Sequence, residues 1–164
     1  LFMPILGIAI SLTTIVGMFY GAKEFDKLLS VVNYGINRAV LITTISVIFF
    51  FVLASNILPI FSSNPLVIDI GVTYLKIIIL VYPAVGISVI CSRVCQALGQ
   101  GMPLLITTIT RVIILTAPLS YYFYFTGRPI EWVWFSQVLA ILIAATISFA
   151  WMRYYFRKFN IVRN

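Results

Sequence analysis

Few side chains in this sequence could take part in acid–base chemistry. The 164 residues include four acids and no histidine. Each acid falls in a predicted loop or at the end of a predicted helix, and the four are Glu24, Asp26, Asp69 and Glu131. A serine triad, a metalloprotease pair or paired aspartates at membrane depth would need groups that this pattern lacks. The sequence therefore predicts a protein that is not an enzyme.

The two cysteines, Cys91 and Cys95, are four residues apart in an apolar stretch. In a helix they would share one face, one turn apart. With no histidine in the chain and no acid nearby, a metal or haem site is not expected, and no cofactor is predicted. The pair is expected to pack as small apolar side chains.

One glycine-rich stretch, RVCQALGQGMPLLITTITR, runs from Arg93 to Arg111. A nucleotide-binding loop would need a preceding strand and a Lys-Ser/Thr pair, and both are missing. A single interrupted membrane span would place two glycines and a proline at mid-bilayer. We therefore expect a hairpin between two helices, with turn residues Gln96, Gly99, Gly101 and Pro103.

The polar residues inside the apolar stretches are mostly serine and threonine. Their general role in membranes is hydrogen bonding between helices, worth about 0.6–2 kcal/mol per contact. The alternative is a weakly polar wall of a transport cavity. The residues predicted for such a wall are Thr13, Thr14, Ser88 and Gln137.

Two prolines, Pro83 and Pro118, lie inside apolar stretches. Each removes a backbone donor, which kinks a helix, and membrane helices tolerate such kinks. A kink near mid-helix is either a static bend or a moving part of a transporter.

Composition indicates where these elements lie. Hydrophobic residues make up 62% of the chain and charged residues 9%, with a mean hydropathy of +1.12. Because a soluble domain carries about 25% charged residues, the lipid bilayer is the expected partner of most of this surface. The net charge of +7 comes from residues beside apolar spans, as in juxtamembrane anchors, so nucleic acid is not an expected partner.

The spacing of charges predicts an all-α fold, a polytopic transmembrane bundle with five spanning helices. A span needs about 20 residues. The segment from Gly21 to Arg38 has apolar residues at helical spacing and is predicted to form a separate amphipathic elbow at the interface. A cytoplasmic tail is expected at 154–164, and the five helices are expected at about 1–21, 36–55, 71–95, 104–126 and 131–153.

Basic residues predict the orientation of the bundle. One side would carry Lys76 and Arg128. The other would be cytoplasmic, as would the C-terminus of this multi-pass plasma-membrane protein. Arg93 and Arg111 are expected there as anchors or gate partners, in a set of nine: Lys23, Lys27, Arg38, Arg93, Arg111, Arg153, Arg157, Lys158 and Arg163.

Several motifs in order resemble the MATE (multidrug and toxic compound extrusion) transporters. They are VGMFYGAKEFDK (16–27), FSSNP (61–65), YLKIIILVYP (74–83) and QALGQGMP (96–103), followed by Arg111 and Pro118. The last motif is the most specific. The resemblance implies two six-helix bundles around a central cavity. This chain would be the C-terminal bundle without its first helix, and the missing N-terminal bundle would be its partner.

The resemblance implies secondary efflux of lipophilic, often cationic, small molecules by H⁺ or Na⁺ antiport. Some sodium-coupled relatives carry an aspartate four residues after a tyrosine. The matching residues here are Tyr82 and Gly86, so the coupling ion is expected to bind outside this chain. The alternatives are a lipid-linked glycan flippase of the same superfamily, and a non-transporting membrane scaffold subunit.

Overall fold

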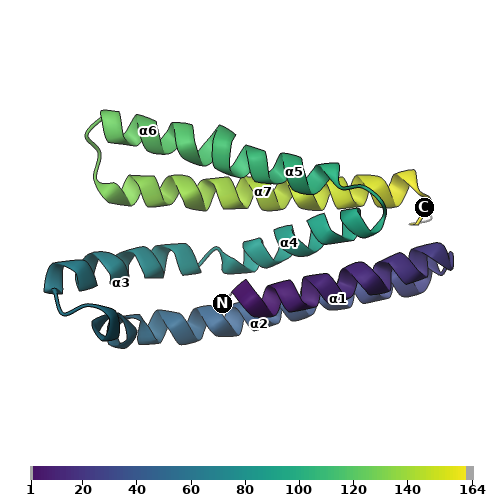
Figure 1. Cartoon of the computed structure of the whole chain (residues 1–164), viewed down its shortest axis with the longest axis horizontal. Helices are drawn as coiled ribbons and strands as arrows, with labels where there is room; N and C mark the ends of the chain where they lie inside the picture. Colours follow the sequence, from purple (N-terminus) through teal and green to yellow (C-terminus); the bar gives the residue numbers. More distant parts are fainter. Residues whose placement is uncertain (1, 162–164) are drawn as a thin grey trace.

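The computed structural model describes residues 2–161, which form helices and no strand. The helices lie nearly parallel in an elongated bundle (Figure 1). In chain order they are α1 (Phe2–Gly21), α2 (Phe25–Phe61), α3 (Pro65–Ile79), α4 (Tyr82–Ala97), α5 (Met102–Ile109), the π-helix η1 (Thr110–Thr116), α6 (Ala117–Phe125) and α7 (Ile130–Lys158).

The bundle confirms the predicted fold class. Four helical segments are long and apolar enough to cross a membrane, namely α1, α2, the continuous run Met102–Phe125, and α7. The pair α3 and α4 counts as a fifth span, bent by 48° at a short break. The chain is therefore a multi-pass membrane protein.

The helix α2 differs from the prediction. Residues 21–38 do not form a separate elbow, because one helix runs from Phe25 to Phe61. The residues at helical spacing continue without a break along one buried face, which comprises Leu28, Val32, Gly35, Ala39 and Thr43. This face packs against α1 and α4. Packing therefore holds the charged first turns of α2 as part of the spanning helix.

The third predicted span, 71–95, is two helices. The first, α3, begins at Pro65, where the Asn64 side chain accepts a hydrogen bond from the Leu66 amide at 3.0 Å. An N-cap followed by proline is a strong helix start. Pro83 lies in the first turn of α4, so the break falls immediately before a residue that lacks an amide donor.

The connection from α4 to α5 is a tight turn. Gly99 has a φ of +78°, which residues with a side chain rarely adopt. The amide of Gln100 donates to the Cys95 carbonyl at 3.0 Å, and the amide of Gly99 donates to Gln96. The helix α5 then begins at Met102, with a buried Pro103 in its first turn.

The helix α7 extends past the predicted end at 153, as far as Lys158. The side chains of Met152, Phe156 and Ile161 are buried in the main core cluster. The first part of the expected tail is therefore a packed part of the bundle. Arg163 lies outside the described residues.

At the centre of the bundle, α4 packs against α1, α2 and α7. Cys91 and Cys95 are fully buried in the main core cluster of the bundle, with Leu12, Val16 and Ile90. We call the end of the bundle where α1, α4 and α7 finish and α2 begins the basic end. Lys23, Lys27, Arg153, Arg157 and Lys158 lie at this end.

Candidate functional site

A cluster of four hydroxyl groups joins three helices near the basic half of the bundle. The Ser148 Oγ on α7 lies 3.1 Å from the Ser88 Oγ and 3.2 Å from the Ser92 Oγ, both on α4. It also lies 3.4 Å from the Thr107 Oγ1 on α5. These distances fix the register of α4, α5 and α7 relative to one another.

The hydroxyl cluster is saturated with hydrogen bonds. Thr107 donates to the Pro103 carbonyl at 2.6 Å, and Ser148 can donate its single proton to the Ala144 carbonyl at 2.9 Å. Among the described residues, every buried side-chain nitrogen or oxygen has a partner. The cluster therefore connects helices, in the way that hydroxyl groups do in membranes, and contains no base that would activate a nucleophile.

A second hydroxyl pair connects the far half of the same helices. The Ser120 Oγ on α6 lies 3.1 Å from the Ser136 Oγ on α7. Ser136 also donates to the Val133 carbonyl at 2.6 Å. Together, the two contacts Thr107–Ser148 and Ser120–Ser136 show that α5–η1–α6 runs antiparallel to α7 in one register.

The four predicted wall residues do not come together. Ser88 lies at the α4–α7 contact. Thr13 is half-buried and donates to the Ala9 carbonyl of its own helix at 2.9 Å, and Thr14 is exposed. Gln137 is half-buried and lies eleven residues, or about 16 Å, along α7 from Ser148.

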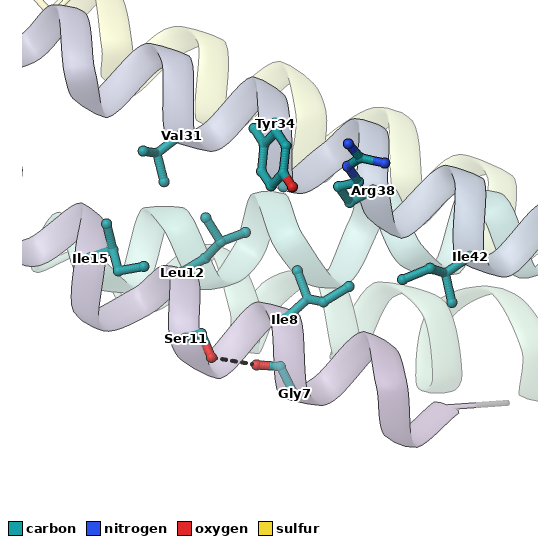
Figure 2. Close-up of a pocket in the computed structure, with 10 residues that line it drawn as sticks. Gly7, Ile8, Ser11, Leu12, Ile15, Val31, Tyr34, Arg38 and Ile42 are labelled. Atoms are coloured by element: carbon teal, nitrogen blue, oxygen red, sulfur yellow. Dashed lines mark hydrogen bonds between the residues drawn. The ribbon is translucent and has the colours of Figure 1, made fainter.

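An open groove of about 500 Å³ lies between α1 and α2 (Figure 2). Most of its lining is apolar. Its polar side chains are Ser11, Tyr34 and Arg38, and the Arg38 guanidinium carbon lies 4.9 Å above the Tyr34 ring. Arg38 was expected at the cytoplasmic surface, but it follows the start of α2 by thirteen residues, or about 20 Å. It therefore lies well inward of the basic end.

The π-helix η1 interrupts the span Met102–Phe125 just before Pro118. The Ala117 amide donates to the Val112 carbonyl, five residues back, and the Thr116 hydroxyl donates to the Arg111 carbonyl at 2.8 Å. Single π-turns inside α-helices are frequent at functional sites. Pro118 follows in the first turn of α6, so the span has two adjacent irregularities.

Arg111 lies within this π-helix and away from both ends of the bundle. It follows Thr107 by four residues, and Ser148 precedes Arg153 by five. Because Thr107 lies level with Ser148, Arg111 is nine residues, or about 13 Å of helix, inward of the level of Arg153. Counted from the other side, through Ser120 and Ser136, Arg111 is fourteen residues, or about 20 Å, from the level of Glu131.

Arg93 lies in a different environment. Its Nη1 donates to the Gln96 Oε1 at 3.0 Å, one turn from the end of α4. Arg93 follows Ser92 of the hydroxyl cluster by one residue, whereas Arg111 lies four residues beyond Thr107 on the far side of the cluster. Arg93 is therefore about 7 Å nearer the basic end than Arg111. The sequence alone did not show how deep either arginine lies, because Arg93 and Arg111 each border an apolar stretch.

The MatE family model matches residues 1–122 of the chain. A probable multidrug resistance protein NorM from Thermotoga maritima is 27% identical over 120 residues, which are 73% of this chain and 26% of that protein. A solved MOP superfamily transporter from Pyrococcus furiosus is 26% identical with a TM-score of 0.89, and the match covers 97% of this chain and 36% of that one.

The fold matches solved transporters in two conformations. An inward-facing multidrug resistance MATE family transporter has a TM-score of 0.90 at 24% identity, with 99% of this chain and 38% of that chain covered. An outward-facing structure has a TM-score of 0.89 at 24% identity, covering 98% and 36%. The chain thus spans about a quarter to somewhat over a third of the length of these relatives.

Proposed function

Since its match to the MatE model covers most of its length, the chain belongs to the MATE family of transporters, and we propose that it forms part of a secondary exporter of lipophilic small molecules. The observation that carries this proposal is the match over residues 1–122. Alternating access would expose a cavity at mid-membrane to each side in turn, as two bundles move about it. The second bundle would come from protein outside this chain.

The irregular spans support a moving role for this half. The break between α3 and α4 bends that span by 48°, and η1 with Pro118 interrupts the next. Membrane helices tolerate breaks and kinks where neighbouring groups satisfy the freed backbone, and transporters build their substrate sites from such discontinuous helices. Pro83 and Pro118 are the residues we assign to these hinges.

The coupling ion is proposed to be H⁺ or Na⁺, bound by carboxylates outside this chain. Glu24 and Asp26 lie at the start of α2, Asp69 lies in the first part of α3, and Glu131 begins α7. None of these positions lies at the depth of the hydroxyl cluster. The residues we propose for the cavity wall are Thr13, Thr14, Ser88 and Gln137, which would contribute at separate points because they do not form one cluster. We also propose that the basic end faces the cytoplasm in a plasma membrane.

A lipid-linked glycan flippase is the second candidate. Such a flippase would need basic side chains along its cavity, whereas most basic residues of this chain lie at the basic end. Arg38 and Arg111 lie inward of the basic end, so cations are available for a pyrophosphate. The two functions differ in whether a free dye leaves the cell.

Dye retention in cells tests the exporter. Cells that express the full-length protein should hold several-fold less of a lipophilic dye than cells with an empty vector, and a protonophore or sodium removal should abolish the difference. Equal retention with the protein present in the membrane would contradict the exporter and leave the flippase or a scaffold.

A further inference from the structure

The charges at depth in this half of the transporter are all positive. The register set by Thr107–Ser148 and Ser120–Ser136 places Arg111 inward from both ends of α7. The four acids lie at helix starts near the two ends of the bundle, as described above. Within residues 2–161 the one salt bridge is Lys27–Glu24, at the basic end. Arg111 therefore carries a charge that this part of the chain leaves uncompensated.

The surroundings of Arg111 suit a ligand with a charged group and an apolar body. Arg111 and Thr110 are half-buried, in a π-helix that packs against α7. The next residues, Val112, Ile113 and Ile114, are exposed by 47%, 63% and 58%. A polar strip thus lies beside an apolar one at the same depth.

The π-helix holds the backbone at this site. In a regular α-helix the Arg111 carbonyl would accept from the Leu115 amide, whereas here the Thr116 hydroxyl donates to that carbonyl at 2.8 Å. The distortion gives up regular helical bonding, and the arginine is its second residue. This coincidence of a π-turn with the one charge of the span indicates a binding site.

We propose that Arg111 binds the anionic group of the transported molecule, an organic anion with a sulfonate, carboxylate or phosphate on an apolar body. The proposal rests on the proposed function and names its substrate class. Arginine keeps its charge and presents a planar fork of donors to such groups. An anion site at Arg111 changes the expected substrate of this half of the transporter from a cation to an anion.

Binding of an anionic and a cationic dye to the full-length protein tests the site. The protein is placed in nanodiscs of phosphatidylcholine, and binding of anilinonaphthalene sulfonate and of ethidium is measured by equilibrium dialysis. Arg111→Gln should weaken sulfonate binding at least tenfold and ethidium binding less than twofold. Arg111→Lys, which keeps the positive charge, should retain most of the sulfonate binding. Arg93→Gln, which removes an arginine nearer the basic end that already bonds Gln96, is the matched control and should change neither.

A charge switch keeps the test valid if Arg111→Gln fails to fold. Arg111→His should bind the sulfonate several-fold more tightly at pH 5 than at pH 8, because the imidazole is charged only at the lower pH. Wild type and Arg93→His should show little change. Unchanged sulfonate binding in Arg111→Gln and Arg111→His, or equal loss for both dyes, would overturn the proposal.

The lipid composition separates a transported anion from a lipid headgroup. Replacing a third of the phosphatidylcholine by phosphatidylglycerol should change sulfonate binding less than twofold. Loss of sulfonate binding in those discs would assign Arg111 to lipid and overturn the proposal. These assays measure binding, so a protein that binds the sulfonate through Arg111 but moves no dye would contradict the exporter alone.

Discussion

The Ser88 hydroxyl on α4 lies 3.1 Å from the Ser148 hydroxyl on α7. These residues are 60 positions apart in the sequence, and their contact joins the central helix of the bundle to its last one. Ser92 and Thr107 complete the cluster. The cluster fixes the depth of every residue on the helices that it connects.

Ser148→Ala should destabilise the bundle. It removes the oxygen that the α4 hydroxyls contact and the close approach to Thr107 on α5, so we expect a loss of about 1–2 kcal/mol in the free energy of unfolding. Thr146→Ala is the control, because Thr146 is exposed and bonds only to the Ile143 carbonyl of its own helix. Unfolding in mixed micelles measures both variants. An equal effect at the two positions would show that the cluster does not join the helices.

Gly35→Val should also be destabilising. A Cβ at Gly35 would collide with the side chain of the buried Leu12 on α1, and overpacking of this kind costs about 1–3 kcal/mol. Gly7→Val provides the comparison, since nothing lies within 4 Å of a Cβ there. If both variants melt at the same temperature, α1 and α2 are not in the described contact.

Deletion of Ile113 should leave the helix register beyond η1 unchanged. A π-turn contains about one residue more than an α-turn, so the deletion converts η1 to regular helix and leaves Ser120 opposite Ser136. The measurement is disulfide formation between cysteines at 120 and 136. It should persist in the Ile113 deletion and fall sharply when Leu119 is deleted instead, because that deletion rotates Ser120 by about 100°. Loss of the cross-link in the Ile113 deletion would count against the π-helix.

The proposed orientation of the bundle predicts opposite labelling at two turns. Gly101→Cys, in the turn between α4 and α5, should react with an impermeant maleimide only from the cytoplasmic side. Gly127→Cys, in the turn between α6 and α7, should react only from outside. Cys91 and Cys95 are buried, so the background in the parent protein should be low. The reverse pattern would invert the proposed topology.

The fold class followed from the sequence because apolar stretches bounded by charges mark membrane spans whatever their contacts. The same rule hid two features. Apolar residues at helical spacing between Gly21 and Arg38 indicated a separate elbow, although the buried face from Leu28 to Thr43 makes α2 continuous. Pro83 indicated a distortion in the third span. The pair Asn64–Pro65 was a readable helix start, but the span was predicted to begin at 71, so α3 starts six residues earlier than expected.

The candidate site was less accessible to sequence analysis. A charge that marks the end of a span is placed at an interface by definition, so Arg111 and Arg38 were assigned to the surface. Their depth depends on which hydroxyl groups meet, such as Thr107 with Ser148, 41 positions later. One local signal was available. Arg111 lies only eight residues after Pro103, and eight residues are too few for a complete span. Arg111 therefore had to lie inside the span that follows the turn at Gly101.

Transport by the purified full-length protein tests the central claim most directly. The protein is reconstituted in liposomes that contain a lipophilic dye, and an inward gradient of H⁺ or Na⁺ is imposed. Our account predicts that one of the two gradients drives dye out of the liposomes at a rate that an ionophore abolishes. Dye movement that is the same with and without either gradient, in liposomes that hold folded protein, would contradict it.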